Sequence, residues 1–229
     1  MPSEMIPLSN KPEPDPHPVL NRCDTRKSRL SITYVARGQC HVMLRRFDPA
    51  RDSFDELTGM LHRAFAPLGE MGLNCTCVDQ SVALTRERVA RGTCYIAVCK
   101  GRIVGTMTLY VRDPYSCCEL YGRGDVASIR QFGVDPAHQG RGIGKLMLAF
   151  AEHWVAARGY AELALDTPQP AAHLMAFYRG QGFRITEFVR FPGKRYNSAI
   201  LSKPAIAYRA RATWSHRIEL SHAGSARAA

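Results

Sequence analysis

The chain has 229 residues, 45% of them hydrophobic, and carries a formal net charge of +11. This length suits one sizeable α/β domain or two small ones. No apolar run approaches the roughly 18 residues that a membrane-crossing helix needs, and residues 1–20 lack the basic start and apolar stretch of a secretory signal. We therefore expect no membrane association, and a cytoplasmic location with reduced cysteines.

The predicted elements alternate between strands and helices. Strands are expected where β-branched and aromatic residues gather between turn signals, at 41–47, 94–99, 103–111, 126–134, 161–166, 183–191 and 198–203, with 31–35 as a candidate for a stray strand before the domain. Helices are expected where apolar residues recur at helical spacing, from 52 or 53 to 65 and at 81–91, 143–158 and 171–179. The order predicts an α/β domain with a central sheet flanked by helices.

The positive charge lies mostly toward the two ends of the chain. Residues 1–46 carry a net charge of +4, residues 47–204 also +4, and residues 205–229 +3. Six prolines fall among the first eighteen residues, a density that prevents regular structure. We therefore expect a poorly ordered, basic segment over 1–40, one domain over 41–204, and a basic C-terminal tail after it.

The eight cysteines do not have the spacing of a zinc site. Cys75 and Cys77 form one C-x-C pair, Cys117 and Cys118 are adjacent, and no C-x-x-C pair occurs. Structural zinc takes four ligands from paired clusters of cysteine or histidine. We expect no metal.

The segment with the clearest chemical character lies between the strand at 126–134 and the helix at 143–158. It reads VDPAHQGRGIGK, with three glycines at the start of the helix. Glycine lets a ligand approach the backbone closely, and the first N–H groups of a helix attract phosphate. The residues that would form this phosphate site are Gln139, Gly140, Arg141, Gly142, Ile143, Gly144 and Lys145.

Two common phosphate motifs do not fit this segment. A Walker loop needs Ser or Thr after its lysine, where this chain has Leu146, and a dinucleotide fingerprint needs G-x-G-x-x-G. The pattern that remains, Q-x-x-G-x-G from Gln139, resembles the acyl-CoA signature of the GNAT acetyltransferases. Two flanking stretches also resemble this family: Ile129-Arg-Gln-Phe-Gly-Val134 followed by Asp-Pro, and Ala176-Phe-Tyr178 followed by Gly182-Phe183. The resemblance covers roughly residues 41–203.

The resemblance implies a fold and a cofactor. The fold is the GNAT acyl-CoA N-acyltransferase fold, a mixed, mostly antiparallel sheet of about six to seven strands that splays between the fourth and fifth. In the family, pantetheine pairs with the exposed backbone of the fourth strand, here Phe132, Gly133 and Val134. Acetyl-CoA is the implied donor, an amine attacks it directly, and a homodimer is a further implication. The sequence does not identify the amine.

The resemblance also implies catalytic roles. Tyr178 occupies the place of the family's usual acid, which protonates the leaving thiolate, although it could instead only pack against pantetheine. Asp166, at the end of a predicted strand, is our first choice for the base, with a cap for the following loop as the alternative. Glu119 and Asp125 are other candidates for the base. We expect His138 at the surface of the phosphate loop.

Two regions are candidates for the acceptor site. The segment 64–79 falls where the family builds its acceptor pocket. The basic turn with Arg190, Lys194 and Arg195 either binds an acidic substrate or the CoA 3′-phosphate, or is a solvated hairpin.

Two other functions compete with an acetyltransferase. One is an acyl-CoA-binding module without catalysis, which would keep the phosphate loop and lose the base. The other is a nucleic-acid-associated protein that uses the basic ends of the chain. No helix-turn-helix or RNA-binding signature supports the second, and aromatic residues do not interleave with the basic clusters.

Overall fold

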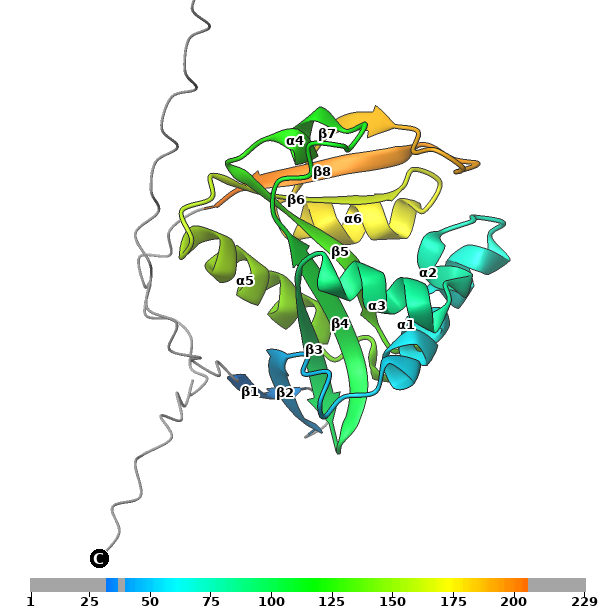
Figure 1. The fold of residues 1–229 in the computed structure, drawn as a ribbon, viewed down its shortest axis with the longest axis vertical. Coiled ribbons are helices and arrows are strands. Elements are labelled where there is room, and N and C mark those ends of the chain that lie inside the picture. Colours follow the sequence, from blue (N-terminus) through cyan, green and yellow to red (C-terminus); the bar gives the residue numbers. More distant parts are fainter. Residues whose placement is uncertain (1–31, 37–39, 206–229) are drawn as a thin grey trace, which may run out of the picture.

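The computed structural model describes residues 32–36 and 40–205, and these form a single sheet flanked by helices (Figure 1). The sheet has eight strands in the order β1-β2-β3-β4-β5-β6-β8-β7. All neighbours are antiparallel except β5 and β6, which are parallel. The strands are β1 Ile32–Ala36, β2 Cys40–Arg46, β3 Thr93–Cys99, β4 Arg102–Tyr110, β5 Val126–Val134, β6 Glu162–Pro168, β7 Arg184–Val189 and β8 Ser198–Pro204.

Serine caps fix the start of two helices. Ser53 Oγ accepts a hydrogen bond from the N–H of Glu56 (3.2 Å), and Ser81 Oγ accepts one from Leu84 (3.1 Å), which satisfies N–H groups that lack an intrahelical partner. The helices are α1 Phe54–Glu70, α2 Thr76–Asp79, α3 Val82–Ala90, α4 Glu119–Gly122, α5 Ile143–Ala156 and α6 Ala172–Gly180, with a 3₁₀ turn, η1, at Pro136–His138. In the described part of the chain, none of them is long and apolar enough to cross a membrane.

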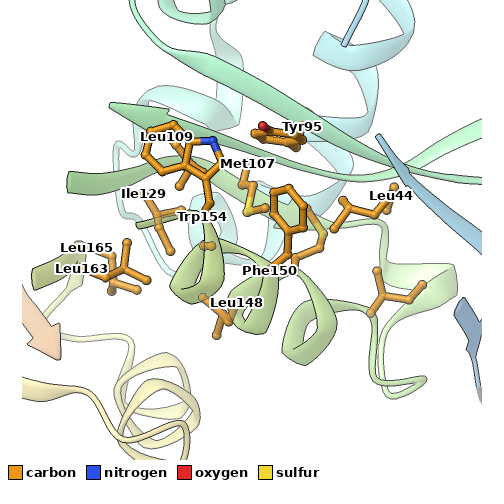
Figure 2. Close-up of a cluster of buried hydrophobic side chains, with 14 of the residues drawn as sticks. Leu44, Tyr95, Met107, Leu109, Ile129, Leu148, Phe150, Trp154, Leu163 and Leu165 are labelled. Carbon is orange, nitrogen blue, oxygen red and sulfur yellow. The ribbon is translucent and has the colours of Figure 1, made fainter. Parts of the chain in front are cut away.

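The helices cover both faces of the sheet (Figure 1). Side chains alternate along a strand, so Cys94 and Ile96 of β3 pack with α1, while Tyr95 and Ala97 pack with α5 on the other face. The core under α5 is the larger one (Figure 2). There the Phe150 ring lies 4.6 Å from that of Tyr95, centroid to centroid.

The predicted fold class is confirmed, with two differences in extent. The sheet has one strand more than the six to seven expected, because β1, inside the segment 1–40, pairs along its length with β2. Helix α1 continues past the predicted end at residue 65, because Leu68 packs on Leu73 and Cys75. Most of the N-terminal segment and of the C-terminal tail lies outside the described residues.

The sheet opens between β5 and β6. These strands pair only from Val126–Ile129 to Glu162–Leu165, whereas β5 stays paired with β4 as far as Val134. A bulge follows the last paired residue: Gln131 has a φ of 49°, and the β4–β5 register shifts there. Counted from residue 41, β5 and β6 are the fourth and fifth strands, so the predicted splay is present.

Candidate active site

A cavity of about 1340 Å³ occupies the splay between β5 and β6. It extends from the start of α5, past α6, to the loop after α1. All the residues predicted for cofactor binding and catalysis line it: Phe132, Gly133, Val134, Gln139, Gly140, Arg141, Gly142, Ile143, Gly144, Lys145, Asp166 and Tyr178. The structure thus brings together residues from four separate segments, although their roles remain predictions.

The glycine loop turns sharply into α5. Gly140 and Gly142 have φ values of 73° and 89°, in the left-handed region that favours glycine, and no side chain caps the helix. Its first N–H groups therefore remain available to an anion. Gly144 differs, because a methyl group there would make only ordinary contacts with Phe132, Val134 and Phe177, at 3.6 Å or more. The protein itself does not require glycine at 144, whereas a closely bound ligand would.

Two side chains hold this loop against the rest of the molecule. Gln139 Nε2 donates to the carbonyl of Val134 (3.0 Å), so Gln139 braces the loop rather than reaching outward. Asp135 Oδ1 accepts from the N–H of Ala137 (3.0 Å), and its Oδ2 accepts from Arg63 Nε of α1 (2.8 Å). The glycine loop is therefore tied to both β5 and α1.

The Arg63–Asp135 ion pair makes the stability of the glycine loop depend on pH. Burial would raise the pKa of Asp135, but the hydrogen bonds from Arg63 and Ala137 outweigh burial and lower it. A carboxylate whose pKa is lower in the folded state stabilises the protein above its unfolded pKa, and this stability is lost as pH falls through the folded pKa.

We expect Arg63→Met to remove about 1 kcal/mol or less at pH 7, because Arg63 is half exposed. The difference between variant and wild type should shrink below about pH 4 as Asp135 takes up a proton. Thermal melting of both proteins from pH 7 to pH 3 measures this. A difference that is constant across the range would contradict the assignment.

Beyond Ile129, β5 presents a backbone edge to the cavity. This edge has no strand partner on the β6 side, so an extended ligand can pair with it. Helix α1 packs on the other side of the same stretch: a methyl group at Gly133 would lie 3.1 Å from Ala64 Cβ and 3.3 Å from the Phe65 ring. Glycine at 133 is thus explained by the approach of α1.

Tyr178 of α6 points its ring into an aromatic cluster with Phe132 of β5 and Phe183. Its ring centroid lies 6.3 Å from that of Phe132 and 6.1 Å from that of Phe183, and 7% of the residue is exposed. Its hydroxyl makes no hydrogen bond to any described residue. Burial raises the pKa of Tyr178, and the negative charge of Asp166 raises it further, so the hydroxyl keeps its proton.

Asp166 is part of a charged network at the apex of the splay. Its Oδ1 accepts hydrogen bonds from Arg130 Nη1 (2.5 Å) and from the hydroxyl of Tyr121 (3.1 Å). The Arg130 guanidinium also stacks on the Tyr121 ring, 3.8 Å from its centroid. Asp166 Oδ2 accepts no hydrogen bond from the described residues and is the oxygen left for a ligand.

The two acidic alternatives to Asp166 as the base do not line the cavity among the described residues. Glu119 begins α4, and Asp125 is ion-paired with Arg123 (2.7 Å); neither is among the described residues that line the cavity. His138 and His173 do line it. The geometry therefore favours Asp166 over both acidic alternatives.

The basic turn between β7 and β8 forms a roof over the cavity with the loop after α1. Asn74 Nδ2 donates to the Gly193 carbonyl (2.8 Å), and Lys194 Nζ donates to the Asn74 carbonyl and to Thr76 Oγ1 (2.8 Å each). Tyr196, whose hydroxyl donates to Cys75 Sγ (3.2 Å), lines the cavity beside Lys194. The turn is therefore docked on the loop after α1 and brings Lys194 into the cavity lining, whereas Arg190 and Arg195 are exposed and are not among the described residues that line it.

The sequence analysis missed Arg88 and Arg130, two cations that line the cavity. A signal was present for Arg130, because this residue is charged and the rest of β5 is not. Within the described part of the chain, no group of three or more His, Cys, Asp or Glu side chains could hold a metal ion.

Sequence comparison identifies the class to which this fold and cavity belong. The family model described as "Acetyltransferase (GNAT) family" matches residues 67–183, just over half of the chain. The chain therefore belongs to the GNAT acetyltransferase family.

Curated relatives match shorter parts of the chain. A mycothiol acetyltransferase of Nocardioides sp. is 37% identical over 59 residues, 26% of this chain and 20% of that protein. An S-(2-succino)cysteine N-acetyltransferase of Bacillus subtilis is 28% identical over 101 residues, 44% of this chain and 59% of that protein. The chain thus spans about a fifth and three fifths of the length of these two relatives.

Solved structures share the fold at low sequence identity. The ribosomal-protein-S18-alanine N-acetyltransferase of Escherichia coli has a TM-score of 0.54 and 16% identity, over 72% of this chain and 94% of that one. The GNAT domain of S. lividans PAT has a TM-score of 0.59 and 14% identity, over 76% and 96%. A Bacillus subtilis acetyltransferase solved in complex with CoA has a TM-score of 0.50 and 19% identity, over 70% and 97%.

Proposed function

We propose that the protein is an N-acetyltransferase that moves an acetyl group from acetyl-CoA to an amine. The observation that carries the proposal is the single cavity in which an uncapped glycine-loop helix, an unpaired strand edge and a protonated tyrosine meet. Membership of the GNAT family and the names of the relatives support the same activity.

The residues of the cavity fit acetyl-CoA. The N–H groups from Gly140 to Lys145, with the side chains of Arg141 and Lys145, would hold the pyrophosphate. The free edge of β5 from Phe132 to Val134 would pair with the pantetheine amides, as an added strand does. The open space at Gly140, where a Cβ would meet nothing within 4 Å, is where a phosphate can approach the backbone.

When bound, acetyl-CoA supplies a thioester whose C–S bond breaks as the N–C bond to the amine forms. Tyr178 holds a proton at its hydroxyl and donates it to the departing sulfur. Asp166 Oδ2 accepts the proton that an ammonium acceptor must lose before attack, since an alkyl ammonium has no lone pair. The second proton, lost from nitrogen as the amide forms, replaces the one that Tyr178 gives to sulfur. Backbone N–H groups of β5 at the bulge stabilise the negative charge that develops on the carbonyl oxygen.

Thermal melting with acetyl-CoA, followed by thiol release with a panel of amines, tests this function. A ligand at 100 times its Kd stabilises the native state by about 2.7 kcal/mol, so we expect a clear rise in Tm. Thiol release that depends on one amine would identify the acceptor. A rise in Tm without release from any amine would favour the non-catalytic binding module, and no rise would contradict acetyl-CoA as a ligand.

We also propose a cytoplasmic location and a homodimer. Cys75, Cys77, Cys94, Cys117 and Cys118 carry free thiols, as a reducing compartment allows, although Cys99 is disulfide-bonded. The homodimer follows from the family resemblance. Cell fractionation and light scattering of the purified protein measure the two properties.

A further inference from the structure

Cationic side chains outnumber carboxylates in the lining of the cavity. Besides Arg141 and Lys145 of the glycine loop and Lys203, which pairs with Glu152, the lining holds three: Arg88 from α3, Arg130 from β5 and Lys194 from the β7–β8 turn. Within the described residues, Arg130 is ion-paired with Asp166. Arg88 and Lys194 instead donate hydrogen bonds to neutral partners, among them Gln80 Oε1 (2.6 Å) and Thr76 Oγ1 (2.8 Å). Their charges are therefore not matched by a carboxylate of the described chain.

These cations face one region, although they come from three elements. Arg88 Nη1 donates to Cys77 Sγ (3.2 Å) and Lys194 Nζ donates to Thr76 Oγ1 (2.8 Å), so both cations hold adjacent residues of α2. The Arg130 guanidinium lies 6.0 Å from the centroid of the Tyr110 ring, and the Tyr110 hydroxyl donates to the carbonyl of Arg88 (2.6 Å). Because Arg88 shares a neighbour with each of the other two, the three form one cationic rim. Hereafter "cationic rim" means Arg88, Arg130 and Lys194.

One carboxylate oxygen lies within this region. Asp166 Oδ1 is used by Arg130 and Tyr121, and Oδ2 is free of hydrogen bonds from the described residues. Glu152, the other acidic residue among the described residues lining the cavity, is ion-paired with Lys203 (2.8 Å). A ligand bound at the cationic rim therefore meets positive charge, and Asp166 Oδ2 is the carboxylate oxygen available to it among the described residues.

The roof restricts the size of what can bind there. The hydrogen bonds from Asn74 to Gly193 and from Lys194 to the loop after α1 close that side of the cavity. Tyr196 and Cys75 pack together beneath them. A compact acceptor fits this space better than a polypeptide segment.

We propose, building on the acetyltransferase function above, that the acceptor is a small zwitterion of the amino-acid type. Its carboxylate is held by the cationic rim, and its amino group faces Asp166 Oδ2 and Tyr178. Arginine and lysine bind carboxylates through charge-assisted hydrogen bonds. Polyamines and other cationic amines meet repulsion from the same side chains, so the rim selects against them.

Matched pairs of amines test the charge preference. Free amino acids are compared with their α-carboxamides, and kcat/KM is measured by thiol release from acetyl-CoA. For the pairs that react, we expect the carboxylate form to be used at least about 10-fold better than the amide. A peptide with N-terminal glutamate and a blocked C-terminus tests the size limit and should be a poor acceptor.

Variants of Lys194 test the cationic rim itself. Lys194→Gln keeps a hydrogen-bond donor and loses the charge, so KM for the carboxylate acceptor should rise about 10-fold while KM for its amide changes less than about twofold. Lys194→Arg should restore the preference. Arg190→Gln is the matched control, because Arg190 lies on the same hairpin but does not line the cavity among the described residues, and it should leave both KM values unchanged.

The outcomes separate this inference from the function on which it rests. Amides used as well as acids, or the peptide used as well as the free amino acid, would overturn the zwitterionic acceptor while the acetyltransferase stands. Thiol release from none of the amines would overturn the acetyltransferase function, and the acceptor proposal with it. A normal rise in Tm with acetyl-CoA in Lys194→Gln shows that its altered KM arises at the acceptor site.

Discussion

Reversing the charges of Arg141 and Lys145 together is expected to weaken acetyl-CoA binding by about 100-fold or more. Both residues flank the uncapped start of α5, where they face the cavity. Two cations next to a pyrophosphate become two anions, and a tenfold loss corresponds to about 1.4 kcal/mol for each reversal. Titration calorimetry of Arg141→Glu/Lys145→Glu against wild type measures the change in Kd.

The folded protein should tolerate this double variant. Neither side chain makes a hydrogen bond or ion pair with any described residue, and glutamate in the first turn of a helix is favourable to the helix dipole. We therefore expect the Tm without ligand to stay within a few degrees of wild type. Gly142 is a less informative target, because its φ of 89° means that any side chain there strains the backbone.

A charge-matched control separates local from overall electrostatics. Arg51→Glu/Arg184→Glu makes the same change in net charge at two exposed arginines that do not line the cavity among the described residues. It should change the Kd by less than about threefold at 0.15 M salt, where charges beyond roughly 8 Å are screened. Equal losses in the two variants would mean that net charge, and not the glycine loop, attracts the ligand.

The parts of the site that the sequence predicts are those built from short segments. The glycines from 140 to 144 and the strand that precedes them are contiguous, so their pattern alone indicates a phosphate loop. Tyr178 was assigned through the resemblance of its short stretch, with Gly182 and Phe183, to the family's second motif. The splay between β5 and β6 came from the family resemblance, because no local pattern shows where two strands separate.

The parts that were missed depend on contacts between distant segments. The partner of Asp166 is Arg130, 36 positions earlier, and their ion pair forms only because β5 and β6 are neighbours at the apex of the splay. The roof joins Asn74 to a turn 119 positions later. Such pairs carry no signal at either position alone, so a basic turn that looks solvated in the sequence can be part of a site.

Asp166 makes contacts that the sequence does not indicate. The sequence predicted Asp166 at the end of a strand, whereas β6 continues to Pro168 and Asp166 lines the cavity from within it. The structure adds that one of its oxygens is bound by Arg130 and Tyr121. The same carboxylate therefore orients a buried cation and offers its second oxygen to a ligand. Removing it would disturb both roles, which makes Asp166→Asn a poor test of catalysis alone.

Tyr178→Phe is the sharper test of catalysis, and we expect it to lower kcat by about 10- to 100-fold. General acids contribute about 100- to 10,000-fold, and the lower range applies because a thiolate, with a pKa near 8.5, already leaves readily. The Kd for acetyl-CoA should stay within about twofold, since the hydroxyl makes no hydrogen bond to any described residue and the ring is kept. Single-turnover kinetics separate the chemical step from binding and product release.

The pH dependence supplies a second criterion for Tyr178. Burial and the charge of Asp166 raise its pKa, so the acid stays protonated and kcat of the wild type should not fall on the alkaline side through Tyr178. Tyr160→Phe is the matched control, because Tyr160 stacks on Trp154 away from the cavity and should retain full activity. A Tyr178→Phe enzyme at the wild-type rate would mean that water protonates the leaving sulfur and that Tyr178 serves only as part of the aromatic wall.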